Sequence, residues 1–292
     1  MKVIDVHTHG TDGFDTGSSD HRQILSMADI QGLLGVSEII PTIYPATIKV
    51  MRRNMAAVKE AMEKQKGSDA SHVAHHASRI AGMHLEGPFL NPIRCGALNV
   101  DAFIEPEEDY LMELIEGFED IVKIITIAPE MQGAERIIRK TADMGIIPSM
   151  GHSDATYSEA ERGFNAGARG ITHIFNAMRS FHHREPGIAG FGLLNREVYI
   201  EVIADPWHLH RATIDLIFKI KNPSRIIVVS DSVQESKISL DAQAITNSTG
   251  LLMGGSIAIT AAVSRLVEAG LDRDLAMNCI TKNPERYLVS CV

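Results

Sequence analysis

The chain opens with MKVIDVHTHG, in which His7 and His9 stand two residues apart at the end of a short apolar run. In an extended strand, residues i and i+2 point to the same face, so both imidazoles would aim at one spot. Such a pair can bind a divalent metal ion, or it can be two polar side chains where a strand meets the turn at Gly10. The pair alone favours the second interpretation, and the rest of the chain has to decide.

Four further imidazole and carboxylate side chains each end an apolar run later in the chain: Glu86 in MHLEGP, His152 in SMGHSD, His173 in ITHIFN and Asp231 in IIVVSDS. If all six groups met at one place, the carboxylates would repel one another, and a divalent cation would resolve that cost. Nitrogen and carboxylate ligands together suit zinc or iron(II) better than magnesium. The six residues therefore predict a site for one or two divalent ions.

These ligand types imply a particular chemistry. A bound metal ion lowers the pKa of its water from about 15.7 to about 7 and polarises a carbonyl oxygen. Asp231 is the candidate to accept the proton of that water and pass it to a leaving group. The pattern predicts hydrolysis of an amide, ester or related bond by attack of metal-bound hydroxide. His84 alternates with Glu86 on one strand face and would support the site without being a ligand.

Eight short, β-branched apolar runs alternate with longer amphipathic segments. The runs cover residues 2–7, 36–43, 79–86, 121–128, 145–152, 170–175, 198–204 and 225–231. Strictly alternating strands and helices indicate a parallel sheet, and eight units indicate an α/β fold closed into a (β/α)₈ barrel of TIM type. In that fold the six groups lie at the carboxyl ends of strands, the face where barrel enzymes build their active sites. We expect residues 1–292 to form this one barrel domain.

Between the runs, apolar residues recur at helical spacing. One buried helix face is marked by Met51, Met55, Val58 and Met62. Residues 129–145 predict a second helix, and residues 154–167 a third, capped by Asp154. Two closing helices are expected at about 257–269 and 272–283.

Composition excludes several classes of function. The chain has 292 residues, of which 45% are hydrophobic and 22% charged, and its formal net charge is −9. The negative charge argues against a nucleic-acid partner or an anionic membrane surface, and no apolar run approaches the roughly 20 residues that span a bilayer. Three cysteines without regular spacing fit a reducing compartment, and the N-terminus lacks the layout of a secretion signal, so we expect a cytoplasmic protein. The polar stretch 63–78 is expected to be a solvated loop on the far face of the barrel, with surface residues His72, His75 and His76.

These motifs resemble those of the amidohydrolase superfamily and, more narrowly, those of the N-acetylglucosamine-6-phosphate deacetylases. The matching stretches occur in order over nearly the whole chain: MHLEGPFLNP, TIAPE, GHSDATYSEA, THIFNAM, REPGIAG, IADPWH and LLMGGS. The resemblance implies a main metal ion held by Glu86, His152 and His173. It also implies that the first histidine pair holds a second ion, which some members of that family lack, and that Asp231 is the acid/base.

The resemblance further implies a sugar-phosphate site. Its residues would be Asn176, Ala177, Arg184, His208 and Met253. A guanidinium suits phosphate through paired hydrogen bonds, but from the residues alone Arg184 can equally form a surface ion pair with Glu185, and His208 can cap the following helix. The implied substrate is an N-acyl amino sugar, first of all N-acetylglucosamine 6-phosphate, which loses its acetyl group. The implied assembly is a homodimer in which a neighbour completes the phosphate site.

The chain departs from the family pattern at four places, one of which is the stretch SVQESKISLDAQAITNSTG that follows Asp231. Leu98, in CGALN, stands where the family usually has a histidine that contacts the substrate, and Pro206 replaces a glycine before His208. The small β-sandwich that relatives build around the barrel is expected to be absent, because the chain starts on the first strand and stops after the last helix.

Two other classes of function stay open from the residues. Another amidohydrolase, or a metal-dependent phosphoesterase or nuclease of the same superfamily, would use the same six groups, although the negative net charge argues against nucleic acid. A non-catalytic protein that binds a sugar phosphate would have lost a catalytic group, and Leu98 is the residue that points that way.

Overall fold

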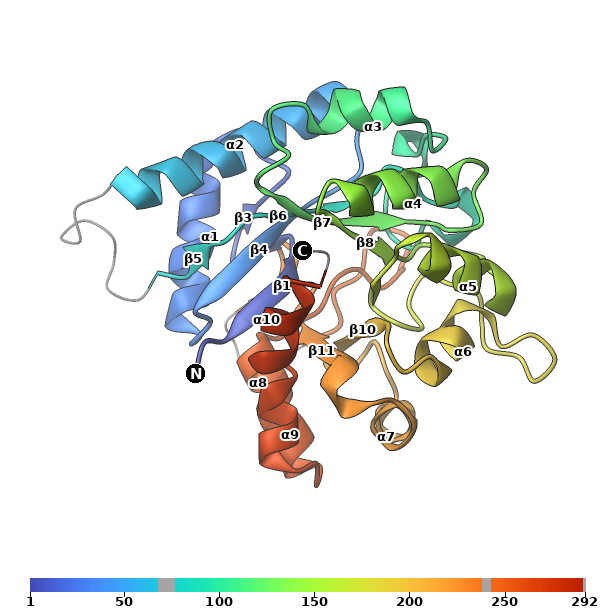
Figure 1. The fold of residues 1–292 in the computed structure, drawn as a ribbon. Coiled ribbons are helices and arrows are strands. Elements are labelled where there is room, and N and C mark those ends of the chain that lie inside the picture. Colours follow the sequence, from blue (N-terminus) through green and yellow to red (C-terminus); the bar gives the residue numbers. More distant parts are fainter. Residues whose placement is uncertain (68–76, 238–242, 291–292) are drawn as a thin grey trace.

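The computed structural model describes residues 1–67, 77–237 and 243–290, and its centre is a parallel sheet that curves into a barrel (Figure 1). Eight strands follow one another around it: β1 (Ile4–Thr8), β4 (Glu38–Ile43), β6 (Met83–Glu86), β7 (Val122–Ile127), β8 (Ile147–Met150), β9 (Gly170–Ile171), β10 (Tyr199–Ile203) and β11 (Ile226–Val229). β5 (Arg79–Ile80) also pairs with β4, and β2 (Gly10–Thr11) forms a separate hairpin with β3 (Phe14–Asp15). Each of the eight strands overlaps one of the eight predicted runs in the same order, so the predicted parallel α/β architecture is confirmed.

The first and last strands of this path meet and nearly close the barrel. The amide of Asp231 donates to the carbonyl oxygen of His7 at 2.8 Å, just beyond the end of β11. Asp5 adds a side-chain link at the same seam, because its Oδ1 accepts from the amides of His7 and Ser230, each at 3.3 Å. The seam therefore holds the two ends of the predicted metal site, in β1 and after β11, against each other.

Helices cover the outside of the barrel (Figure 1). They are α1 (His21–Leu33), α2 (Ile48–Gly67), α3 (Glu108–Ile115), α4 (Ala134–Asp143), α5 (Tyr157–Ala166), α6 (Gly187–Leu194), α7 (Arg211–Ile220), α8 (Ile259–Glu268), α9 (Arg273–Asn278) and α10 (Lys282–Tyr287). Their apolar faces pack on the strands in one continuous core, and α2 buries the predicted methionine face. The second predicted closing helix, 272–283, is shorter and corresponds to α9, and α10 begins where that prediction ends.

The inside of the barrel has two layers of different chemistry. At the amino-terminal end of the strands, isoleucines such as Ile40 and Ile147 pack around Tyr287 of α10. Nearer the carboxyl ends lies a polar layer, which we define as His84, Thr126, Ser149, Thr172 and Glu201, all buried. Three hydrogen bonds of 2.7 to 2.9 Å join the first four of these residues. The polar layer lies next to the predicted metal ligands.

Helix α5 begins later than predicted, and Asp154 does not cap it. Thr156 is the cap, and it forms a capping box in which Thr156 and Glu159 bond reciprocally to each other's main chain. Asp154 instead pairs with Arg94 and Arg179, each at 2.6 Å. The two guanidinium groups offer Asp154 stronger partners than a helix amide would, because both carry full charge.

Two remaining expectations concern segments away from the site. Helix α2 continues to Gly67, into the stretch expected to be a loop, and His72, His75 and His76 lie outside the described residues. Within the described ranges, no helix combines the length and the apolar character needed to cross a membrane.

Candidate functional site

All six residues predicted for the metal site are buried at the carboxyl end of the barrel, and Asp231, at 9%, is the most exposed. They are His7 and His9 at the end of β1, Glu86 at the end of β6, His152 after β8, His173 after β9 and Asp231 after β11. The last three each stand two positions past the final residue of their strand, so one geometry recurs at three strand ends.

Three of the six form a first cluster, the Glu86 group, made of Glu86, His152 and His173. Glu86 Oε1 lies 3.1 Å from His152 Nε2 and 3.0 Å from His173 Nε2, and the two nitrogens are 3.2 Å apart. One carboxylate oxygen and two imidazole nitrogens thus surround a single point.

The other three form a second cluster, the His7 group, made of His7, His9 and Asp231. His7 Nε2 lies 3.2 Å from His9 Nε2 and 3.2 Å from Asp231 Oδ1. Glu86 joins the two clusters, because its second oxygen, Oε2, lies 3.2 Å from His9 Nε2. A carboxylate in this position can bridge two ions.

The hydrogen-bond partners of two histidines indicate that these clusters fit cations. His7 Nδ1 lies 2.9 Å from the Glu201 carboxylate, and His152 Nδ1 lies 2.9 Å from the carbonyl oxygen of Arg94. A carbonyl oxygen can only accept a hydrogen bond, and so can an ionised carboxylate. With Glu201 ionised, each Nδ1 therefore carries the proton and each Nε2 presents a lone pair. Those lone pairs face the oxygens of Asp231 and Glu86. Lone pairs that converge on carboxylates repel unless a cation lies between them.

The pKa values of the buried acids and histidines are shifted because so many ionisable groups lie close together at this site. Burial raises the pKa of Asp231 well above its ordinary value, and the carboxyls of Glu86 and Glu201 raise it further. Burial also raises the pKa of Glu201 to about 7. Burial acts to raise the pKa of Glu86 too, but the charge of His152 and the hydrogen bonds of the surrounding histidines hold it well below its usual range. Burial lowers the pKa of His7, which favours the neutral imidazole that binds metal.

The backbone is strained where three of these side chains emerge. His152, His173 and Asp231 have φ angles of 46°, 31° and 47°, in the left-handed region that residues other than glycine rarely adopt. Each such residue costs roughly 1–3 kcal/mol and persists only where the surrounding structure holds it. Strain of this kind concentrates at functional sites, and here it coincides with side chains that converge on the two groups.

A cavity of about 480 Å³ opens over the two groups, and five of the six residues, all but His7, line it. Its remaining wall is largely apolar, with Leu98, Val233, Leu251 and Leu252 among the lining residues. Of the described residues, no lysine or arginine lines this cavity. The volume suits a small molecule the size of a monosaccharide.

The structure brings four of the five predicted substrate residues to this cavity: Asn176, Ala177, His208 and Met253. It does not bring Arg184 there. Arg184 is exposed in the loop before α6, where its guanidinium lies 3.2 Å from the ring of His183. Its alternative partner, Glu185, accepts instead from the amides of Tyr157 and Gly187. Within one chain, Arg184 therefore serves neither role.

His208 connects two loops of the cavity wall. Its Nδ1 lies 2.9 Å from Asp205 Oδ2, and its Nε2 lies 2.8 Å from the carbonyl oxygen of Met253. It does not cap α7, because the side chain of His210 accepts from the amide of Ala212 in that position. Hydrogen bonds and the charge of His208 outweigh burial and lower the pKa of Asp205 to about 2.

Several residues of the site had not been predicted. Glu201 bonds to His7, and Tyr44 stacks on His9 with ring centroids 3.9 Å apart. A signal existed for Glu201, because it is the one charged residue in the buried run VYIEVIA. Tyr44 follows an apolar run like many surface residues and gives no such signal.

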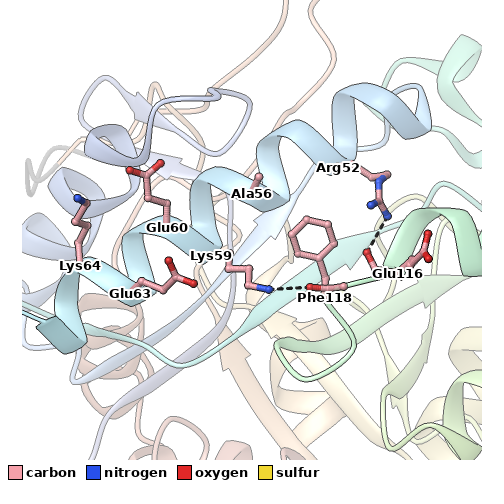
Figure 2. A pocket seen from close by; sticks show the side chains of 9 residues that line it. Arg52, Ala56, Lys59, Glu60, Glu63, Lys64, Glu116 and Phe118 are labelled. Carbon is pink, nitrogen blue, oxygen red and sulfur yellow. Dashed lines mark hydrogen bonds between the residues drawn. The ribbon is translucent and has the colours of Figure 1, made fainter.

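A groove of about 750 Å³ between α2 and the turn after α3 is a different feature (Figure 2). Arg52 and Lys59 face it, but they donate to the carbonyl oxygens of Glu116 and Gly117, at 3.1 and 2.9 Å. Both cations also lie over the ring of Phe118. These contacts join the end of α3 to α2 in the outer layer, so both cations have a structural role.

Comparison with known proteins agrees with this geometry. No protein-family model matches the chain. It is 29% identical to an N-acetylgalactosamine-6-phosphate deacetylase of Escherichia coli O157:H7, over 98% of this chain and 76% of the relative. It is 30% identical to an N-acetylglucosamine-6-phosphate deacetylase of Vibrio furnissii, over 90% of this chain and 67% of the relative. The crystal structure of N-acetyl-D-glucosamine-6-phosphate deacetylase from Mycobacterium smegmatis superposes with a TM-score of 0.86 at 25% identity, over 98% of this chain and 77% of that one.

Proposed function

Because this chain belongs to the family of N-acetylglucosamine-6-phosphate deacetylases, and is thus a hydrolase of an amide bond, we propose that it hydrolyses the acetamide of N-acetylglucosamine 6-phosphate. The products are acetate and the free amino-sugar phosphate. The observation that supports this most directly is the pair of donor clusters on the floor of a monosaccharide-sized cavity.

The donor chemistry fits a divalent metal, zinc or iron(II), because neutral imidazoles and carboxylates converge with their lone pairs. The Glu86 group would hold the main ion and the His7 group a second. A divalent ion held there supplies a more acidic water and a polarised acyl carbonyl.

Asp231 is the residue to which we assign the proton transfer of the reaction. Its Oδ1 lies 3.2 Å from His7 Nε2 and 3.5 Å from His9 Nε2, and its side chain reaches the cavity. Its carboxylate would accept a proton from the attacking water. The same group then delivers the proton to the departing amine.

The sugar would lie between Asn176, Ala177, His208 and Met253. A phosphate on that sugar carries negative charge, and no lysine or arginine among the described residues lines the cavity of one chain to offset it. We propose that the enzyme is a homodimer in which an Arg184 guanidinium reaches the phosphate in the neighbour's cavity. The exposed position of Arg184 supports this assignment.

The deciding experiment measures turnover of N-acetylglucosamine 6-phosphate together with bound metal. N-acetylgalactosamine 6-phosphate is a second substrate to assay, because one relative carries that name. Acetate release from either compound, abolished by a chelator and restored by zinc or iron(II), is the expected result. A metal-loaded protein that releases no acetate from any N-acetyl amino-sugar phosphate would refute the proposal.

Replacement of Arg184 by alanine is expected to raise KM for the phosphorylated sugar roughly 10- to 100-fold, the loss of a hydrogen bond to a charged group. The value of kcat should change little, and turnover of unphosphorylated N-acetylglucosamine should not change. Steady-state kinetics on both sugars and the molecular mass in solution check this. Arg162→Ala is the matched control, because Arg162 is an exposed arginine of α5 that pairs with Glu135 of α4. An unchanged KM in Arg184→Ala, or a monomeric enzyme at full activity, contradicts the role.

A further inference from the structure

Glu201 is a buried acid in the middle of β10, with 1% of its surface exposed. It belongs to the polar layer of the barrel interior and lies behind the metal ligands, away from the lining of the cavity. A carboxylate is costly to bury without a charged partner. The contacts of Glu201 therefore have to offset the free-energy cost of its burial.

The contacts of Glu201 reach both donor clusters. Its Oε2 lies 2.9 Å from Nδ1 of His7, in the His7 group. The same oxygen accepts from the main-chain amide of His173, in the Glu86 group, at 3.4 Å. Glu201 thus touches one side chain of the His7 group and only the main chain of the Glu86 group.

The side-chain contact fixes the direction in which His7 can bind. With its Nδ1 proton donated to Glu201, the ring presents the Nε2 lone pair towards His9 and Asp231. In the Glu86 group, the equivalent contact of His152 goes to the neutral carbonyl oxygen of Arg94. The orientation of His7 therefore depends on a carboxylate, whereas that of His152 does not.

Charge balance supports the same distinction. Two divalent ions would bring four positive charges, and the ligands Glu86 and Asp231 would offset two of them. Glu201 adds a third negative charge next to His7. No lysine or arginine in the described ranges pairs with Glu201, in contrast to Glu38, which binds Lys2 and Arg79. Its other oxygen, Oε1, is buried and makes no hydrogen bond within those ranges.

We propose that Glu201 is a positioning residue that orients His7 and thereby enables the His7 group to hold a second metal ion. The Glu86 group holds its own ion without this help. The inference rests on the metal site of the proposed function and adds the residue that determines whether one ion or two are bound.

The test compares Glu201→Gln with Glu201→Leu. Glutamine keeps the shape and an amide oxygen that accepts from Nδ1 of His7, whereas leucine keeps the volume but offers no acceptor. Each protein is loaded with cobalt(II), freed of excess ion, and analysed for ions per chain and for its visible absorption spectrum. We expect two ions in the wild type and one in the leucine variant. The glutamine variant should bind the second ion about 10- to 100-fold more weakly than the wild type.

Thr126→Val is the matched control, because Thr126 lies in the same polar layer but its hydroxyl bonds to His84 and Thr172 and to none of the six predicted ligands. It is expected to bind two ions. Circular dichroism shows whether the leucine variant is folded. If it is not folded, the proposal is tested by the dissociation constant of the second ion in the glutamine variant.

Several results would overturn the proposal: a single ion in the wild type, two ions at wild-type affinity in the folded variants, loss of both ions from a folded leucine variant, or loss of one ion from Thr126→Val. None of these ion counts depends on turnover. A failure of the proposed deacetylase activity, seen as the absence of acetate release by the wild type, is therefore separate from a failure of this inference.

Discussion

Replacement of Asp231 by asparagine is expected to lower kcat for the amino-sugar phosphate about 10³-fold, the scale of lost general acid–base catalysis. Asparagine has the shape of aspartate and keeps one acceptor oxygen, but it cannot take a proton from water. It cannot deliver one to the amine either. The Glu86 group does not include Asp231, so the main ion should remain bound and KM should change little.

The measurement is kcat and KM at a fixed pH, with elemental analysis of the same samples. Asp143→Asn, an exposed aspartate at the end of α4, is the control and should behave as the wild type. Equal activity in Asp231→Asn would show that another group transfers the proton. A loss of activity that follows a loss of the main ion would show that Asp231 acts as a ligand only.

Much of the barrel could be predicted because buried parallel strands produce continuous β-branched runs. The run 198–204 corresponds to β10 (Tyr199–Ile203), and 36–43 to β4 (Glu38–Ile43). The predicted strand 170–175 is shorter, since β9 ends at Ile171. The residues after Ile171 are still largely apolar, but His173 and Phe175 adopt left-handed backbone conformations that end the strand pairing. Hydrophobic pattern carries no information on that turn.

The candidate site was predictable in its position but not in its detailed geometry. Because parallel strands end on one face of a barrel, residues after different strands could be expected to meet, and the structure brings all six together. Which nitrogen of His7 carries a proton depends on Glu201, a contact between residues 194 positions apart in the chain. The loop that carries Arg184 has no periodic pattern, so its distance from the cavity could not be predicted.

Replacement of Glu86 by glutamine is expected to abolish binding of the main ion and to lower kcat by at least about 10³-fold, since an ion contributes several kcal/mol to such a reaction. Glu86 is the only anion of its group, and its two oxygens face nitrogens in both clusters. Glutamine replaces one oxygen with an amide NH2 group that donates to an imidazole lone pair. The variant can therefore satisfy the histidines without any cation.

That difference makes thermal stability a test independent of activity. Chelation should destabilise the wild type by roughly 4 kcal/mol if the free ion was present at a thousandfold excess over its dissociation constant. The melting temperature of Glu86→Gln should respond to the chelator less than that of the wild type, because only an ion in the His7 group would be left to remove, whereas Glu161→Gln, an exposed glutamate on α5, should respond like the wild type. A variant whose response to the chelator is reduced, and which melts near the wild type once both are stripped of metal, has lost the main ion and kept the fold. If chelation lowers the melting temperature of Glu86→Gln as much as that of the wild type, the stabilising ion lies elsewhere, and the assignment of the Glu86 group to the main ion is wrong.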